Sequence, residues 1–495
     1  MSSDVQTGTI RTQIPARLDR LPWSRFHWKV IIGLGTVWIL DGLEVTIVGS
    51  ISGRVGEKGA GVGIAAANVS GLAASLYVAG ACVGALVFGQ LTDRFGRKKL
   101  FMITLGVYLL ATTLTAFSFS PVWFYVFRFF TGFGIGGEYA AINSAIDELI
   151  PSKTRGRVDI AINGSYWAGA AGGALLAVVA LNTSTFAVNV GWRLCFGLGA
   201  VLGLGVLLVR RSVPESPRWL FIHGRDEEAE KVVAEIEAEV RKSTGRELPE
   251  PKGEMTVRQR RVIPLSMTIR TLVSLYPKRT VLGLALFVGQ AFLYNSILFG
   301  LGDLLGTYFK VSSGDVPYYL AVFAVGNLFG PLVLGRLFDT VGRKPMISGT
   351  YVLSGALLIV TAFLFKGHHL TATSLTLALT IIFFFASAGV SAAYLTVSEI
   401  FPMETRALCI SVFYAVGTAL GGITGPLLFS SLVKSGSYGE TALAFIIGAV
   451  MMVIGGLVEL VYGIKAEGRG LEDIATPLTV QDSPSGLPPS AAPAT

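Results

Sequence analysis

One ten-residue motif occurs twice in the chain, first as Gly89-Gln-Leu-Thr-Asp93-Arg94-Phe-Gly96-Arg97-Lys98 and 246 residues later as Gly335-Arg-Leu-Phe-Asp339-Thr-Val-Gly342-Arg343-Lys344. A second motif is also duplicated, at an offset of 251 residues, as Glu148-Leu-Ile-Pro151-Ser-Lys-Thr154-Arg155 and Glu399-Ile-Phe-Pro402-Met-Glu-Thr405-Arg406. Two motifs that recur in the same order at nearly one offset indicate that the chain consists of two related halves.

Long apolar runs separate these motifs. A helix needs ~20 mostly apolar residues to cross ~30 Å of hydrocarbon. Twelve runs of suitable length lie near residues 28–50, 69–90, 100–120, 122–146, 158–181, 190–210, 280–308, 317–338, 345–366, 374–398, 407–431 and 441–464. The first motif follows runs 2 and 8, and the second follows runs 4 and 10. We therefore predict an all-α membrane protein with twelve transmembrane helices in two pseudo-symmetric six-helix halves.

The overall composition agrees with a membrane protein. Of the 495 residues, 52% are hydrophobic and 15% are charged, whereas average soluble chains are ~25% charged. This excludes a soluble multidomain enzyme, a disordered chain and a disulfide-rich secreted domain. We predict an N-terminal tail over residues 1–27 and a first six-helix half over 28–210. A central loop with an amphipathic helix follows over 211–279, then a second six-helix half over 280–464 and a partly disordered tail over 465–495.

The positive charges predict the orientation in the membrane. With both termini inside, 33 of the 40 Lys and Arg residues fall on the inner side and five on the outer side. The positive-inside rule therefore predicts that both tails and the central loop are cytoplasmic. No nucleic-acid partner is expected, because the basic residues are spread over many short loops. The three cysteines and four histidines show no metal-ligand spacing, so we expect neither a metal nor a cofactor.

The residue types within the duplicated motifs suit a gate between the halves. Gly89 would let two helices cross closely, and Asp93 lies near a helix end, where it can pair with Arg97 or cap a neighbouring helix. Two charge pairs could hold the halves shut on the cytoplasmic side: Glu148 with Arg155, and Glu399 with Arg406. The alternative is that these loops only retain positive charge inside. The motifs also contribute the candidate gating residues Arg94, Asp339 and Arg343.

Four of the charged residues within the predicted spans are candidates for a function in the membrane: Asp41, Glu44, Arg128 and Glu138. An ionisable side chain at mid-bilayer costs ~2.5–3.5 kcal/mol, so each needs a partner or a function. Asp41 and Glu44 in the first span share roughly one helical face. Arg128 in the fourth span keeps its charge, whereas a buried acid can take up a proton. We interpret the set as a proton switch; the alternative is a static ion pair between spans 1 and 4. Glu138 is a third candidate acid, and its alternative is a helix-end contact.

Four further motifs are Arg128 followed by Gly132, Gly134 and Gly136; Pro214-Glu215-Ser216-Pro217-Arg218-Trp219-Leu220; Ser398-Glu399-Ile400-Phe401-Pro402; and Gly468-Arg469-Gly470-Leu471-Glu472-Asp473-Ile474. Together they resemble the major facilitator superfamily, and within it the sugar porter family and its relatives. The resemblance implies solute transport by alternating access.

The resemblance also implies roles for single residues. It aligns Glu44 with the acid that sugar–proton symporters use and Arg128 with the partner of that acid, and Asp41 matches a pattern of aromatic-acid symporters. Glu215 and Arg218 join the candidate gating residues.

Polar and aromatic residues of spans 5, 7 and 10 are the candidates for a substrate cavity. They are Asn163, Tyr166, Trp167, Gln290, Tyr294, Asn295 and Tyr394. Amides offer both donors and acceptors, and aromatic faces stack on a ring. The alternative for the amides is hydrogen bonding between helices. The Gly-Gly-acid sequence that ends at Glu138 resembles metabolite, niacin-type and phosphate proton symporters.

These observations favour a proton-coupled symporter that imports a small polar organic solute, such as a sugar or an organic acid. The expected partners are this solute, protons and membrane lipid, and we expect a monomer in the cell membrane (the inner membrane, if the source is bacterial). The main alternative is a passive facilitator of the same solutes. A drug-efflux antiporter fits less well, because the segment 164–173 has no proline. A solute-sensing receptor is a further alternative. An enzyme is not expected, because no nucleophile, base and metal set converges.

Overall fold

The computed structural model describes residues 6–210, 214–251, 253–260, 265–402, 405–469 and 471–475. Within these residues, the predicted twelve spans are confirmed. In the N-terminal half they are α2 (Arg25–Val55), α3 (Ala66–Asn68) with α4 (Ala74–Phe95), α5 (Arg97–Ala116), α6 (Pro121–Leu149), α7 (Ser152–Gly164) with α8 (Tyr166–Ala180), and α9 (Val188–Arg210). In the C-terminal half they are α13 (Pro277–Phe309), α14 (Val316–Thr340), α15 (Arg343–Lys366), α16 (Ala372–Glu399), α17 (Arg406–Thr418) with α18 (Thr424–Lys434), and α19 (Tyr438–Tyr462).

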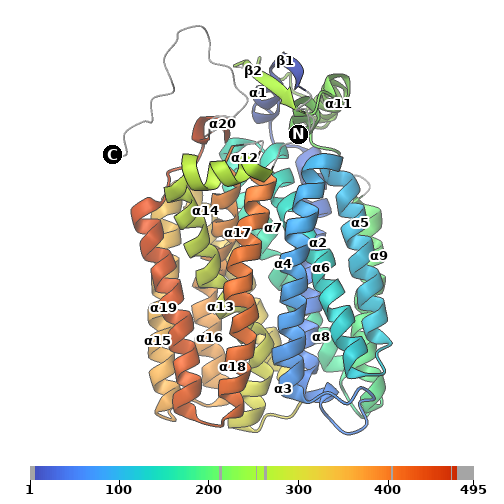
Figure 1. Ribbon diagram of the computed structural model, residues 1–495, viewed down its shortest axis with the longest axis vertical. Coiled ribbons are helices and arrows are strands. Elements are labelled where there is room, and N and C mark those ends of the chain that lie inside the picture. The colour runs from blue at the N-terminus through green and yellow to red at the C-terminus, as the bar shows by residue number, and fades with distance from the viewer. Residues whose placement is uncertain are drawn as a thin grey trace.

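The two halves stand side by side, with their helices along the long axis of the molecule (Figure 1). Ten of the spans are long and apolar enough to cross a membrane by composition alone, and α6 and the α7–α8 pair complete the set. Spans 2 and 11 each contain one π-helical turn, at Val69–Ala73 and Ala419–Ile423, and span 5 breaks at Ser165. The part of the C-terminal tail after residue 475, predicted to be disordered, lies outside the described residues.

The short elements outside the bundle gather at one end of it, where the first and last described elements, β1 and α20, both lie (Figure 1). We call this end the terminal face and the other end the opposite face. Strand β1 (Gln6–Thr12) pairs antiparallel with β2 (Met255–Arg260), which joins the N-terminal tail to the central loop. This small sheet adds to the predicted helices, and its two strands lie far apart in the sequence. The helices α1 (Ile14–Asp19), α12 (Leu265–Arg270) and α20 (Leu471–Ile474) lie at the same end.

The central loop forms the predicted amphipathic helix, α11 (Asp226–Thr244). Three acids occupy its first turn and two bases its last, which suits the helix dipole. Its predicted apolar stripe is buried at Ala229, Val233, Ile236 and Val240. The helix packs against α1, α2 and α10 (Pro217–Ile222). The stripe therefore packs on the protein itself.

Two glycines of the duplicated motif explain why the motif recurs. Gly96 and Gly342 have φ angles of 91° and 112°, which only glycine adopts at little cost. Each stands directly before a span, α5 or α15, so the turn between spans is built the same way in both halves. A Cβ atom on Gly96 would also lie 2.5 Å from a carboxylate oxygen of Glu215.

Close packing of α4 on α6 positions the buried arginine of span 4. A Cβ atom on Gly132 would lie 1.8 Å from the Tyr77 carbonyl oxygen, and one on Gly136 would lie 1.9 Å from that of Ala81. The two backbones can touch only because these residues lack side chains. Arg128, one turn before Gly132, is thereby held with its guanidinium carbon 4.8 Å from the centre of the Tyr77 ring.

Candidate functional site

A cavity of about 110 Å³ lies between the two halves. All seven residues predicted for a substrate cavity line it: Asn163, Tyr166, Trp167, Gln290, Tyr294, Asn295 and Tyr394. They come from α7 and α8 of the N-terminal half and from α13 and α16 of the C-terminal half. The structure therefore brings together residues that are more than 200 positions apart in the sequence.

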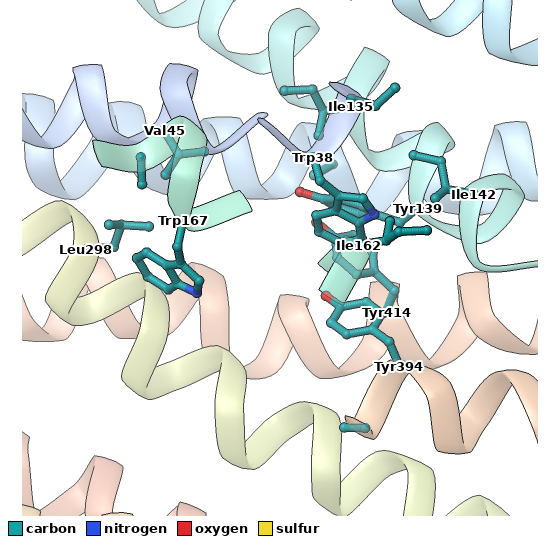
Figure 2. Close-up of a cluster of buried hydrophobic side chains, with 14 of the residues drawn as sticks. Trp38, Val45, Ile135, Tyr139, Ile142, Ile162, Trp167, Leu298, Tyr394 and Tyr414 are labelled. Carbon is teal, nitrogen blue, oxygen red and sulfur yellow. The ribbon is translucent and has the colours of Figure 1, made fainter. Parts of the chain in front are cut away.

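Eight of the nineteen described residues that line the cavity are aromatic. Figure 2 shows Trp38, Tyr139, Tyr394 and Tyr414 gathered together, with Trp167 apart from them beside Val45 and Leu298. The Trp38 and Tyr139 rings stack at a centroid distance of 4.8 Å, and the Tyr139 and Tyr414 centroids are 4.6 Å apart. Flat rings on several sides suit a planar or ring-shaped solute.

Four aromatic residues of this wall were not predicted from the sequence: Trp38, Tyr77, Tyr139 and Tyr414. They lie on spans 1, 2, 4 and 11, where an aromatic residue could equally face lipid or a neighbouring helix. The sequence contained one indication that Trp38 faces the cavity. It lies three residues before Asp41 and so shares the helical face of that acid.

Asp41 lies directly behind this wall and is buried. The Tyr77 hydroxyl donates to Asp41 Oδ1 at 3.0 Å. The Tyr139 hydroxyl donates to Asp41 Oδ2. The carboxylate therefore joins two tyrosines that line the cavity.

Glu44 and Arg128 form an ion pair between α2 and α6, and both side chains are fully buried. Arg128 also lies over the rings of Tyr77 and Phe196, 4.8 and 5.5 Å from the ring centres. Arg128 Nε and Nη2 are buried without a hydrogen-bond partner among the described protein atoms. Glu138 is buried elsewhere on α6 and accepts a hydrogen bond from Thr104 of α5 at 3.2 Å.

On the terminal face, two acids hold the start of α5. Glu148 Oε1 lies 2.6 Å from Arg97 Nη2, with both side chains buried, and Glu148 also accepts from the Ser216 hydroxyl. Glu215 accepts the backbone N–H groups of Arg97 at 3.0 Å and Lys98 at 3.2 Å. A carboxylate at a helix N-terminus is stabilised by the helix dipole.

The N-terminal tail also contacts this network. Arg218 Nη1 donates to the Glu148 carbonyl oxygen at 3.5 Å, and its Nη2 lies 3.7 Å from Asp19 of α1. The other carboxylate oxygen of Asp19 lies 3.5 Å from Arg155 Nη2. Asp19, which sequence reasoning missed, therefore stands between two of the predicted gating arginines.

Contacts between the halves lie on the same face. Arg155 Nη1 of the N-terminal half lies 3.7 Å from Glu399 Oε1 of the C-terminal half, and Glu399 also pairs with Arg343. The Arg157 backbone N–H donates to Asp339 Oδ2 across the same interface at 2.9 Å. Predicted gating residues of both halves thus meet here.

The remaining predicted gating residues have different positions. Gly89 of α4 faces α17, where its Cβ atom would lie 2.1 Å from Ser411 Oγ, so this close crossing joins the two halves. Arg406 is buried and donates to a carbonyl in the loop before α17. Arg94 is exposed on the surface. The side chain of Asp93 lies outside the described part of the chain.

The halves also meet on the opposite face, through an acid that was not predicted. Asp303 of α13 accepts hydrogen bonds from Ser52 of α2 at 3.2 Å and from Ser70 of the π-helical turn before α4. The Ser70 and Ser430 hydroxyl oxygens are 3.5 Å apart. The two halves therefore contact each other on both sides of the cavity.

Twelve spans in two similar halves, with a polar and aromatic cavity between them, define a membrane transporter of small solutes. The model of the sugar (and other) transporter family matches residues 43–478. The chain belongs to this family, which is part of the major facilitator superfamily. It is a multi-pass membrane protein that transports small solutes, and it is not an enzyme.

Similar proteins cover almost the whole chain. The niacin transporter NiaP of Acinetobacter baylyi is 28% identical over 464 residues, which span 93% of this chain and 99% of that protein. The organic cation/carnitine transporter 7 of Arabidopsis thaliana is 25% identical over 94% of this chain and 97% of its own length. A solved structure of the proton:xylose symporter XylE superposes with a TM-score of 0.72 over 91% of this chain and 98% of that chain. At 18% sequence identity, that superposition shows the fold alone.

Proposed function

We propose that this chain is a proton-coupled symporter that imports a small polar organic solute, such as a sugar or an organic acid, by alternating access. The observation that supports it most is the buried Glu44–Arg128 pair next to the aromatic cavity. In this proposal the terminal face is cytoplasmic, the protein works as a monomer, and its partners are the solute, protons and lipid.

The chemistry of the pair supports coupling. Arg128 stays charged at any relevant pH, whereas Glu44 can accept a proton and become neutral. Protonation would remove the attraction between the two helices, and loss of the proton would restore it. A purely static buried pair is stable when its polar atoms are all hydrogen-bonded. Arg128 has two nitrogens with no hydrogen-bond partner among the described atoms, which favours a pair that opens during transport.

The names of the relatives refer to several different solutes and do not identify one for this chain. They refer to niacin, to organic cations and carnitine, and to xylose. What these solutes share is small size and polar groups. The cavity suits them because its volume is small and its wall combines amides with aromatic rings.

The test is proton movement that depends on solute. The purified protein is reconstituted into liposomes that contain a pH-sensitive dye, and D-xylose, nicotinamide or nicotinate is added outside. We expect at least one of these probes to drive protons inward and to accumulate further when an inward proton gradient is imposed. A passive facilitator would give equal accumulation with and without the gradient, which would contradict the proposal.

A further inference from the structure

A row of alternating charges crosses the interface between the two halves on the terminal face. In the C-terminal half Arg343 pairs with Glu399, and Arg155 of the N-terminal half lies 3.7 Å from the same acid. Arg155 Nη2 lies 3.5 Å from one carboxylate oxygen of Asp19, and Arg218 Nη2 lies 3.7 Å from the other. Asp19 is therefore the carboxylate that lies between the two arginines of the N-terminal half.

Asp19 comes from the N-terminal tail and is held in place by the central loop. It is the last residue of α1, whose residues Ile14 and Leu18 are buried. Glu237 of α11 lies 2.6 Å from Arg20, directly after Asp19. The helix α11 in turn packs against α2, the first span. The tail and the central loop therefore fix the position of this carboxylate relative to the N-terminal half.

The contribution of Asp19 differs between the closed and open forms of the terminal face. Arg155 is fully buried here, and a buried guanidinium keeps its charge and depends on nearby carboxylates. Glu399 is one of them, but it also serves Arg343, which lies 3.8 Å from Asp339 as well. When the halves separate at this face, water reaches Arg155, and the attraction of a neighbouring carboxylate weakens. Asp19 therefore stabilises the closed form more than the open form.

We propose that Asp19 is a positioning residue of the gate on the terminal face. It holds Arg155 where this side chain can reach Glu399 of the other half, and so it makes the N-terminal tail part of the transport cycle. The family model matches residues 43–478, so α1 lies outside the matched part of the chain. The inference rests on the proposed alternating access, because it concerns the balance between two conformations.

The test measures distances between the halves with pairs of spin labels at exposed positions. The protein is used at full length, without its three buried native cysteines, and is reconstituted into liposomes. Lys99 with Lys465 reports the terminal face, and Thr183 with Lys366 reports the opposite face. We expect Asp19→Asn to raise the ratio of open to closed terminal faces about two- to fivefold, with a matching closure of the opposite face. Asp19→Glu keeps the carboxylate and should resemble the wild type.

Two controls separate positioning from a general structural effect. A third label pair, Gln13 with Lys231, reports whether α1 stays docked on α11, and its distance should not change in Asp19→Asn. Glu239→Gln removes another acid of α11, whose partner is the exposed Lys29, and should leave the gate distances unchanged. If the gate opened only together with undocking of α1, Asp19 would merely anchor the helix and the inference would be wrong.

A double-mutant comparison tests the route through Arg155. In an Arg155→Gln background the guanidinium is absent, so Asp19→Asn should not change the distances further. An equal effect in this background, or unchanged distances in Asp19→Asn alone, would overturn the inference. Glu399→Gln is the reference for alternating access itself. If it opens the terminal face and Asp19→Asn does not, only the role of Asp19 is refuted; if it does not, alternating access through this gate fails as well. The distances need no proton gradient, so a passive facilitator would give the same result.

Discussion

Arg128 is the residue whose charge most needs a partner, because it is fully buried in a membrane span and cannot lose its proton. Its acid partner, Glu44, is the natural place for a transported proton. Glu44→Gln imitates the protonated acid, so we expect it to abolish proton-driven accumulation while solute exchange across the liposome membrane continues. The measurement compares accumulation under a proton gradient with exchange at equal pH. If accumulation survives, Asp41 or Glu138 carries the proton instead.

Site residues could be predicted from the sequence where a polar side chain lies within an otherwise apolar span. The seven cavity residues could be selected because amides are uncommon inside spans and because a family pattern pointed to positions in spans 5, 7 and 10. The aromatic residues Trp38, Tyr77, Tyr139 and Tyr414 could not be selected, since the direction in which an aromatic side chain points depends on helix packing. Asp303 was missed for a related reason. Its hydroxyl partners come from the other half of the molecule.

At the scale of elements, α1 is docked on α11 by charge. Glu237 lies 2.9 Å from Arg17 and 2.6 Å from Arg20. Burial alone would raise the pKa of Glu237, but hydrogen bonds from both arginines outweigh it and hold that pKa below its usual value. A carboxyl with a lowered pKa stabilises the docked form above its usual pKa, and this contribution is lost as the pH falls through the lowered value.

We therefore expect α1 to stay docked at neutral pH and to loosen only in acid, below the usual pKa of a glutamate. Spin labels at the exposed positions Gln13 and Lys231 would report this as a broadened distance distribution. Glu237→Gln should broaden the distribution already at neutral pH. Glu239→Gln is the control, because its partner Lys29 is exposed and such surface pairs contribute little. A distribution that is the same in Glu237→Gln and wild type would contradict this account.

The ends of the spans were predicted to within a few residues, because apolar runs and the charged loops between them are local features. The pairing of segments that lie far apart in the sequence was not predicted. The strands β1 and β2 join the tail to the central loop, and Arg155 reaches Glu399 of the other half. Such contacts depend on how the two halves pack against each other. One sequence by itself does not predict that packing.

At the scale of the whole molecule, alternating access requires that contacts on the two faces break in turn. The terminal face is held by Arg155 and Glu399, and the opposite face by Asp303 with Ser52 and Ser70. Loss of a charged hydrogen-bond partner costs ~1–3 kcal/mol, and ~1.4 kcal/mol changes an equilibrium about tenfold. Weakening one face should therefore shift the molecule towards the conformation in which that face is open.

Two substitutions should consequently act in opposite directions. Single cysteines at Ser411, which touches Gly89 on the terminal side, and at Ser430, near Ser70 on the opposite side, report the opening of each face by their rate of thiol labelling. The background lacks the three native cysteines, which are buried. We expect Glu399→Gln to raise labelling at 411 and lower it at 430, and Asp303→Asn to do the reverse. Because general loss of stability would raise both rates together, only opposite changes support two gates coupled through one rigid movement of the halves.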